Sequence, residues 1–134
     1  MRLLTKAKDG GPESPVDGYF LFEIKSLCSV ALLKFNAGQR ENFHTHAFNA
    51  LTWFLTGDLQ EEDFNGSTYT YRRGLMPKLT LREKNHRVKA YRDSWCLTLR
   101  GPWADTWTED TKEKTTVLTH GRKVLRETLK SKSL

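Results

Sequence analysis

Short runs in which apolar and polar residues alternate recur along the chain, and this two-residue period is typical of β-strands. The alternation is clearest over residues 19–27, where Phe20, Phe22 and Ile24 would share one face of a strand. Further strand-like runs cover residues 29–35, 48–55, 75–81, 88–91, 95–99 and 105–108. No long stretch has a convincing helical period, so the pattern predicts an all-β sandwich or barrel.

A tight hairpin is predicted at Asn65-Gly66. Both residues tolerate the positive φ angles that a type I′ turn requires. A two-residue loop at this point would place Asp58 opposite Arg73 on the paired strands. Such an exposed ion pair adds little stability but helps to fix the register.

The chain's 134 residues correspond to one domain with its own core. We expect an N-terminal arm over residues 1–18, a barrel domain over residues 19–126 and a basic tail over residues 127–134. Hydrophobic residues make up 37% and charged residues 28% of the chain, as in soluble globular proteins. No apolar run approaches the roughly 18 residues that cross a bilayer, and the first residues lack the apolar region of a secretory signal. These features predict a cytoplasmic protein without a membrane partner.

The net charge of +6 is concentrated at the C-terminal end. Residues 111–134 hold seven basic side chains against two acidic ones and therefore carry +5. Such a segment could bind nucleic acid or another polyanion, but no aromatic residue is interleaved to stack on bases, which favours a solvated tail. Residues 115–126 are interpreted as a hairpin that turns at His120-Gly121, with a helix over residues 122–130 as the alternative.

The two cysteines, Cys28 and Cys96, each lie in an apolar run rather than in a paired CxxC motif. We expect both to be reduced, because disulfides are rare in the cytosol. Neither is assigned to a metal site.

The candidate chemistry lies between residues 38 and 57. His44 and His46 are two residues apart, so in an extended strand both imidazoles project to the same face. Neutral imidazole is a common ligand of late first-row metals, and His86 could complete a site. The competing interpretation is a polar strand edge for the pair and a solvated loop for His86. The same-face spacing and the flanking glycines favour a metal site.

With Gly38, His44, His46 and Gly57 at these spacings, the chain resembles the cupin superfamily. The first motif of that superfamily is a glycine, five residues, His-x-His, three or four residues, a glutamate, six residues and a glycine. The resemblance covers roughly residues 20–110.

The chain departs from the cupin pattern at two places. Ala50 or, at the longer spacing, Leu51 occupies the position of the family's glutamate. The proline-x-glycine that precedes the histidine of the second motif is absent before His86. The closest match is therefore a site of three histidines. Glu61 and Glu62 follow on the same strand, but only one can face the interior, and a solvent edge is the more common place for such a pair.

The resemblance implies a double-stranded β-helix, or jelly-roll barrel. It also implies a divalent metal held by His44, His46 and His86, with Fe(II) favoured and Zn, Mn or Ni as alternatives. The expected function is an Fe(II)-dependent oxygenase of a small polar or anionic molecule, with its catalytic residues unassigned. Two alternatives remain open: a non-enzymatic cupin that binds a small ligand or a polyanion, and a metal-independent isomerase. A homodimer is compatible with the resemblance, since cupins often dimerise.

Residues that bind the substrate can be proposed only from side-chain chemistry. Arg100 and Arg72 could each hold a carboxylate or a phosphate in a fork geometry. For Arg100, an edge-strand charge is an equally weighted alternative. Trp53 and Trp103 could form an aromatic wall around a ligand, although tryptophan more commonly packs in a core.

Overall fold

The computed structural model describes residues 2–9, 14–39, 43–110 and 114–130. Within these ranges the chain forms β-strands, one 3₁₀ turn and no α-helix, which confirms the all-β prediction. The elements in chain order are β1 (Arg2–Lys8), β2 (Val16–Ile24), β3 (Cys28–Phe35), β4 (Gly38–Gln39), β5 (Phe43–His44), β6 (Ala50–Asp63), β7 (Thr68–Arg72), β8 (Lys78–Thr80), β9 (His86–Arg100), β10 (Thr106–Asp110), β11 (Lys114–Thr119), η1 (His120–Arg122) and β12 (Lys123–Leu129). Nowhere in the described ranges is there a helix that could cross a membrane.

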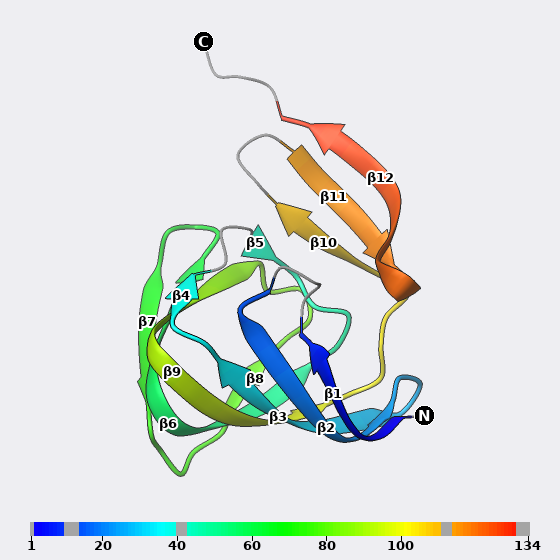
Figure 1. The fold of residues 1–134 in the computed structure, drawn as a ribbon. Helices are drawn as coiled ribbons and strands as arrows, with labels where there is room; N and C mark the ends of the chain where they lie inside the picture. Colours follow the sequence, from blue (N-terminus) through cyan, green and yellow to red (C-terminus); the bar gives the residue numbers. More distant parts are fainter. Residues whose placement is uncertain (1, 10–13, 40–42, 111–113, 131–134) are drawn as a thin grey trace.

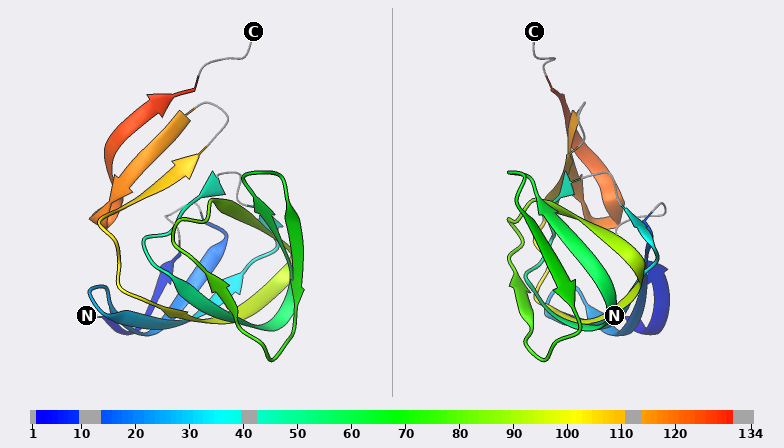
Figure 2. Two further views of the ribbon diagram at one scale, coloured as in Figure 1. Left: turned by 180° about the vertical axis from the view of Figure 1, so that it is seen from behind. Right: turned by 90° about the vertical axis from the view of Figure 1, so that its left-hand side faces the viewer.

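The strands form one antiparallel sheet that rolls up into a barrel (Figure 1). Neighbouring strands follow the order β1-β2-β3-β9-β5-β10-β11-β12, and β6 pairs with β7, β8 and β9. The last three strands extend beyond one end of the barrel as a ribbon, which the right-hand view of Figure 2 shows nearly edge-on. The fold is therefore an all-β jelly roll with a C-terminal extension.

A bend at Gly57 lets β6 pair with both halves of β9. Gly57 has a φ of 106°, and a Cβ at this position would lie 2.0 Å from Oγ of Ser94 on β9. The β6–β9 register shifts on both sides of this glycine, as at β-bulges, which bend and twist a strand. As a result, Ala50 lies opposite Arg100 at one end of the pairing, and Glu61 lies opposite Val88 near the other.

The main hydrophobic core lies inside the barrel. Every second residue of β2 and β3 is directed inward over much of their length, as the alternating sequence predicts. The main cluster comprises Val16, Phe20, Ala31, Leu33, Leu59, Ala90 and Cys96. Both cysteines are free, and burial raises the pKa of the Cys96 thiol to about 12, which makes it a poor nucleophile.

The hairpin at Asn65-Gly66 is present, but its predicted register was wrong by one residue. The amide of Asp63 donates to the carbonyl of Ser67, so the loop contains three residues rather than two. Gly66 has a φ of 95°, which fits a three-residue loop that ends in a glycine bulge. Asp58 is consequently opposite Arg72 and not Arg73, with 3.7 Å between Oδ1 of Asp58 and Nε of Arg72.

Two further predictions from the sequence have different outcomes. Residues 86–100 form one continuous strand, not two, because backbone pairing to β6 and β3 continues through the polar residues 92–94. The C-terminal hairpin is confirmed, since β11 and β12 pair across the 3₁₀ turn at His120–Arg122. At the N-terminal end, β1 pairs with β2.

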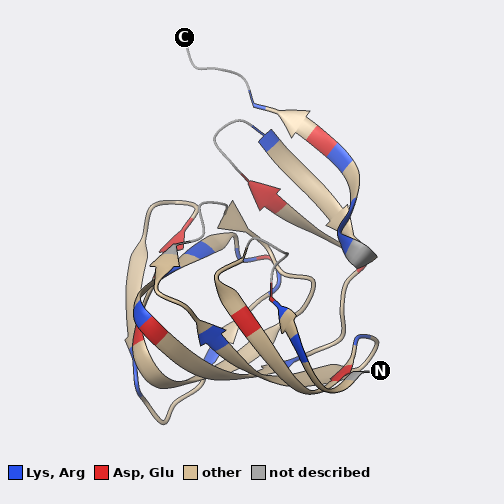
Figure 3. Ribbon diagram, viewed as in Figure 1, with Lys and Arg blue, Asp and Glu red and all other residues tan. Residues whose placement is uncertain are grey.

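Charges of both signs lie on the C-terminal strands (Figure 3). Nζ of Lys114 is 3.0 Å from a carboxylate oxygen of Glu127, and Nζ of Lys130 is 3.3 Å from one of Asp110. Part of the basic charge of this segment is therefore engaged in ion pairs within the protein.

Candidate metal centre and barrel cavity

Three histidines converge at one end of the barrel. His44 ends β5, His46 follows two residues later, and His86 begins β9 directly opposite His44 in the antiparallel register. One ring nitrogen from each of the three lies within 4.8 Å of the others. His44 and His86 are buried, and His46 is half-buried. The structure thus brings together the three imidazoles that the spacing predicted.

The spacing of the nitrogens fits a shared metal ion. Nε2 of His46 lies 2.8 Å from Nε2 of His86. Two nitrogens bonded to one ion at about 2.1 Å, and about 90° apart, are separated by about 3 Å. The cluster can therefore hold a divalent metal with little rearrangement of this pair.

Glu61 contacts His86 at Nδ1, the ring nitrogen that does not face His46. Glu61 is 2% exposed, and its Oε2 lies 2.5 Å from Nδ1 of His86. Its other oxygen accepts hydrogen bonds from Lys78 at 2.5 Å, Lys84 at 2.8 Å and the Tyr71 hydroxyl at 3.3 Å. Burial alone would raise the pKa of Glu61, but the hydrogen bonds from His86, Lys78 and Lys84 outweigh it and hold the pKa well below its usual range. Glu61 is therefore a carboxylate.

This contact selects the tautomer of His86. A carboxylate can only accept, so Nδ1 of His86 carries a proton, and Nε2 is the nitrogen that a metal would bind. Outer carboxylates of this kind orient histidine ligands and increase their basicity in metal sites. Glu62, the neighbouring residue, pairs instead with Arg87 at 2.9 Å.

The pKa values of the groups around Glu61 are also shifted. Burial lowers the pKa of Lys78, although Glu61 opposes the shift. Burial also acts to lower the pKa of Lys84, but Glu61 and Asp63 outweigh it and raise that pKa. Burial and the charge of Glu61 raise the pKa of Tyr71, so its hydroxyl keeps its proton at neutral pH. The sequence offered no signal for this network beyond the alternation that turned one glutamate inward.

A cavity of about 430 Å³ lies inside the barrel. This volume falls within the roughly 300–1,000 Å³ typical of small-molecule sites. Its lining includes the three histidines, Glu61 and Tyr71, together with Arg100, Trp103 and Trp107. The candidate metal centre therefore opens on a space that a small molecule can occupy.

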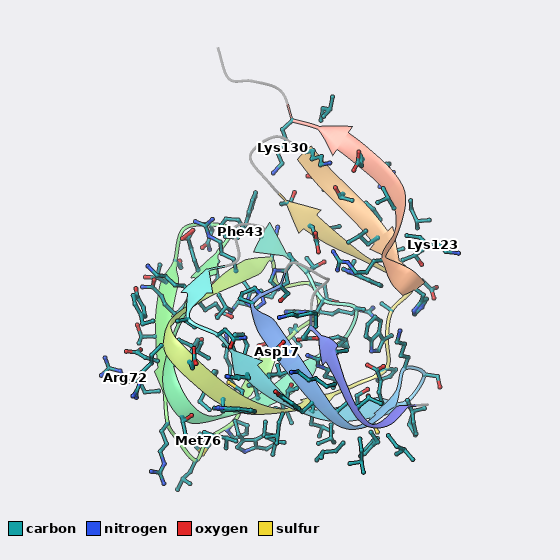
Figure 4. The ribbon with its side chains drawn as sticks, in the orientation of Figure 1. Asp17, Phe43, Arg72, Met76, Lys123 and Lys130 are labelled. Atoms are coloured by element: carbon teal, nitrogen blue, oxygen red, sulfur yellow. The ribbon has the colours of Figure 1, made fainter. Side chains whose placement is uncertain are left out.

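The predicted substrate-binding residues fall into two groups. Arg100 and Trp103 line the cavity, and Arg100 is 3% exposed. Arg72 and Trp53 are not among the residues that line it. The side chain of Arg72 is 75% exposed and points away from the barrel (Figure 4). The structure therefore brings Arg100 and Trp103 to the cavity, but not Arg72 or Trp53.

The fold has known counterparts among solved structures, whereas no protein-family model and no curated protein matches the chain. A sugar phosphate isomerase from the cupin superfamily, from Silicibacter pomeroyi, superposes with a TM-score of 0.61 over 98% of this chain and 93% of its own, at 12% identity. Ectoine synthase from P. lautus has a TM-score of 0.58 over 74% of this chain and 72% of its own, at 16% identity. An RmlC-like cupin from Shewanella frigidimarina has a TM-score of 0.55 over 71% and 81%, at 13% identity. The chain thus has the cupin fold, as its histidine motif indicated.

Proposed function

We propose that this protein is a metal-dependent enzyme in which His44, His46 and His86 hold a divalent ion, with Fe(II) favoured, and the barrel cavity holds a small polar or anionic substrate. The observation that carries the proposal is the hydrogen bond from Nδ1 of His86 to Glu61. The ion pairs of Glu61 with Lys78 and Lys84 stabilise the fold, but its contact with His86 acts on the ring that would bind a metal. A metal site gains an imidazole fixed in the ligating tautomer.

Oxygenase chemistry is the reaction class that this ligand set favours. Three neutral imidazoles leave coordination positions open, and an Fe(II) ion held by them supplies redox chemistry with dioxygen. The protein's own residues position the reaction. Glu61 fixes the ring of His86, and buried Phe48, whose ring centroid is 5.4 Å from that of His46, limits the access of water on that side.

An isomerase is the second candidate, and Tyr71 favours it. Tyr71 lines the cavity, and its hydroxyl, which donates to Glu61, could instead donate a hydrogen bond to a sugar oxygen. The name of the Silicibacter pomeroyi neighbour, a sugar phosphate isomerase, is consistent with this chemistry on the same fold. Deuterium incorporation from D₂O into a panel of sugar phosphates, followed by NMR, tests this candidate.

The metal content of the purified protein tests the proposal first. Protein purified without added metal, analysed by mass spectrometry of the elements, should contain about one divalent ion per chain, and iron with oxygen uptake supports the oxygenase. His86→Ala should lose the ion, whereas His120→Ala, which changes a histidine in the turn before β12, should keep it. A wild-type chain that binds no added Fe(II), Co(II) or Zn(II) would contradict the proposal and favour a non-enzymatic binding module.

A further inference from the structure

Two buried N–H donors belong to residues that line the cavity. Nε of Arg100 and Nε1 of Trp103 have no hydrogen-bond partner among the described residues. Both side chains line the cavity, and Arg100 is almost completely buried. Buried donors in native proteins are nearly always paired with protein, water or a ligand, and an unpaired one costs stability. These two donors therefore call for an acceptor that the described chain does not supply.

The two donors belong to side chains that pack on one ring. Cζ of Arg100 lies 4.5 Å from the ring centroid of Phe48, and the rings of Trp103 and Phe48 are 5.5 Å apart. The other neighbour of Phe48 is His46, whose ring is stacked on it at 5.4 Å. A single aromatic ring thus separates the two donors from the candidate metal centre, and a short molecule can reach both.

Charges of both signs lie at this end of the cavity, whose lining also includes the buried carboxylate of Glu23, in register with Ser29 and Arg100. Nη2 of Arg100 donates to Oδ2 of Asp9 at 2.6 Å, so part of its charge is neutralised. A guanidinium has five N–H donors, and the ion pair with Asp9 uses one of those at Nη2. Nζ of Lys25 lies 4.6 Å from the ring centroid of Trp103 and adds positive charge to the same region. Asp9 would therefore compete with an incoming anion without excluding it.

We propose that Arg100 and Trp103 form the anion-binding end of the substrate site and take the carboxylate or phosphate of a short-chain molecule whose other end reaches the histidines. This inference rests on the proposed function and names the substrate class for it. Carboxylate and phosphate share the required chemistry, because each offers several acceptor oxygens to a guanidinium and an indole N–H. Trp103 adds a neutral N–H donor to the charged donors of Arg100. The ligand must compete with Asp9 for the guanidinium of Arg100.

Calorimetric titration with malonate, succinate and inorganic phosphate tests the inference on metal-free and Co(II)-loaded protein. At least one of these anions should bind, and succinamide, the neutral analogue of succinate, should not. Which anion binds distinguishes a carboxylate substrate from a phosphorylated one. Trp103→Phe keeps the ring and removes only the N–H, so affinity should fall about tenfold. Arg100→Lys keeps the charge but loses the fork, and we expect a loss of about tenfold or more.

Asp9→Asn gives the most specific result, since it removes the competing carboxylate and should strengthen anion binding several-fold. A purely structural role for the Arg100–Asp9 pair would predict the opposite, because the variant would weaken the fold and the site together. Arg126→Met on exposed β12 and Trp95→Phe outside the cavity are the matched controls, and both should bind as the wild type does. Circular dichroism verifies that each variant is folded.

The possible failures are distinguishable. If Co(II) binds at the histidines and none of the anions binds, or if the Arg100 and Trp103 variants bind them as the wild type does, the anion site is wrong and the metal centre stands. If an anion binds through Arg100 and Trp103 in a protein that takes up no metal, the proposed enzyme fails and the anion site stands.

Discussion

The two ends of the barrel cavity differ in how their polar groups are satisfied. At the histidine end, both oxygens of Glu61 are engaged, one by His86 and the other by Lys78, Lys84 and Tyr71. At the arginine end, Arg100 has an ion pair with Asp9, but its Nε and the indole N–H of Trp103 have no acceptor among the described residues.

This difference in hydrogen bonding indicates what holds the side chains in place at each end. A hydrogen-bonded network holds its members in one arrangement, so the imidazole of His86 is oriented by Glu61 before any metal binds. Unmatched donors in a cavity instead favour a bound acceptor. The histidine end is therefore preorganised by the chain, whereas the arginine end is completed by a ligand.

Replacing a histidine should produce the largest difference between the two ends. His44→Ala and His86→Ala each remove one of three ligands, so affinity for Co(II) should fall by more than about 100-fold, which is beyond the effect of outer-sphere changes. Binding of the preferred anion by metal-free protein should change little, because Arg100 and Trp103 remain. Metal titrations and anion titrations on the same preparations make the comparison. Equal losses of both ligands would indicate a general loss of structure.

Glu61→Gln should weaken the histidine end without removing a ligand. The amide cannot replace the charge that pairs with Lys78 and Lys84, so we expect stability to fall by about 3 kcal/mol, as when one partner of a buried ion pair is removed. Metal affinity should fall about 10–100-fold, because His86 loses its orienting partner. Urea denaturation and Co(II) titration provide the two measurements.

Glu62→Gln is the matched control for Glu61→Gln, since Glu62 is adjacent but pairs with Arg87 and is partly exposed. Its effect should stay within about 1 kcal/mol, with unchanged metal affinity. Should the two variants behave alike, Glu61 would have no special role behind His86.

Gly57→Ala should affect both ends together. Its φ of 106° is strained for alanine, and the added Cβ would clash with Ser94 on β9. We expect a loss of about 2 kcal/mol from strain and overpacking. Because the bend places Ala50 opposite Arg100 and Glu61 near His86, metal and anion affinity should fall in parallel. A selective loss at one end would show that the two halves of β6 are positioned independently.

Asp110→Asn should have the smallest effect and should leave both ends unchanged. Burial alone would raise the pKa of Asp110, but hydrogen bonds from Thr115, Asn85 and Lys130 outweigh it and lower the pKa. The ionised carboxylate therefore stabilises the fold fully above the unfolded-state pKa of about 4, and this contribution is lost as the pH falls through the lower folded-state pKa. We expect the variant to lose about 1 kcal/mol at pH 7 and to match the wild type in strong acid. Denaturation curves across pH check this.

Much of the histidine end could be predicted from the sequence, because short-range geometry determines it. His44 and His46 share a face through the two-residue period alone, and the cupin motif pointed to His86. The role of Glu61 could not be settled, since the bulges around Gly57 decide which of two adjacent glutamates turns inward. Lys78 and Lys84 reach Glu61 from a different strand and a loop, and no local pattern marks such contacts.

The register of the hairpin at Asn65-Gly66 also could not be predicted from the sequence. The dipeptide identified the turn, but a three-residue loop and a two-residue loop differ by one step in register. That step exchanged Arg73 for Arg72 as the partner of Asp58. At the arginine end, Arg100 lines the cavity, whereas Arg72 offers the same chemistry but faces solvent, and side-chain chemistry alone did not separate them.

The most direct test of the central claim is the position of a bound metal. A crystal of the protein grown with Fe(II) under anaerobic conditions, or with Zn(II), can be measured on both sides of the absorption edge of that metal. We predict one anomalous peak within bonding distance, about 2.1 Å, of a nitrogen from each of His44, His46 and His86. A peak bonded to other residues, or no peak in a crystal of protein that was exposed to excess metal, would contradict the metal centre.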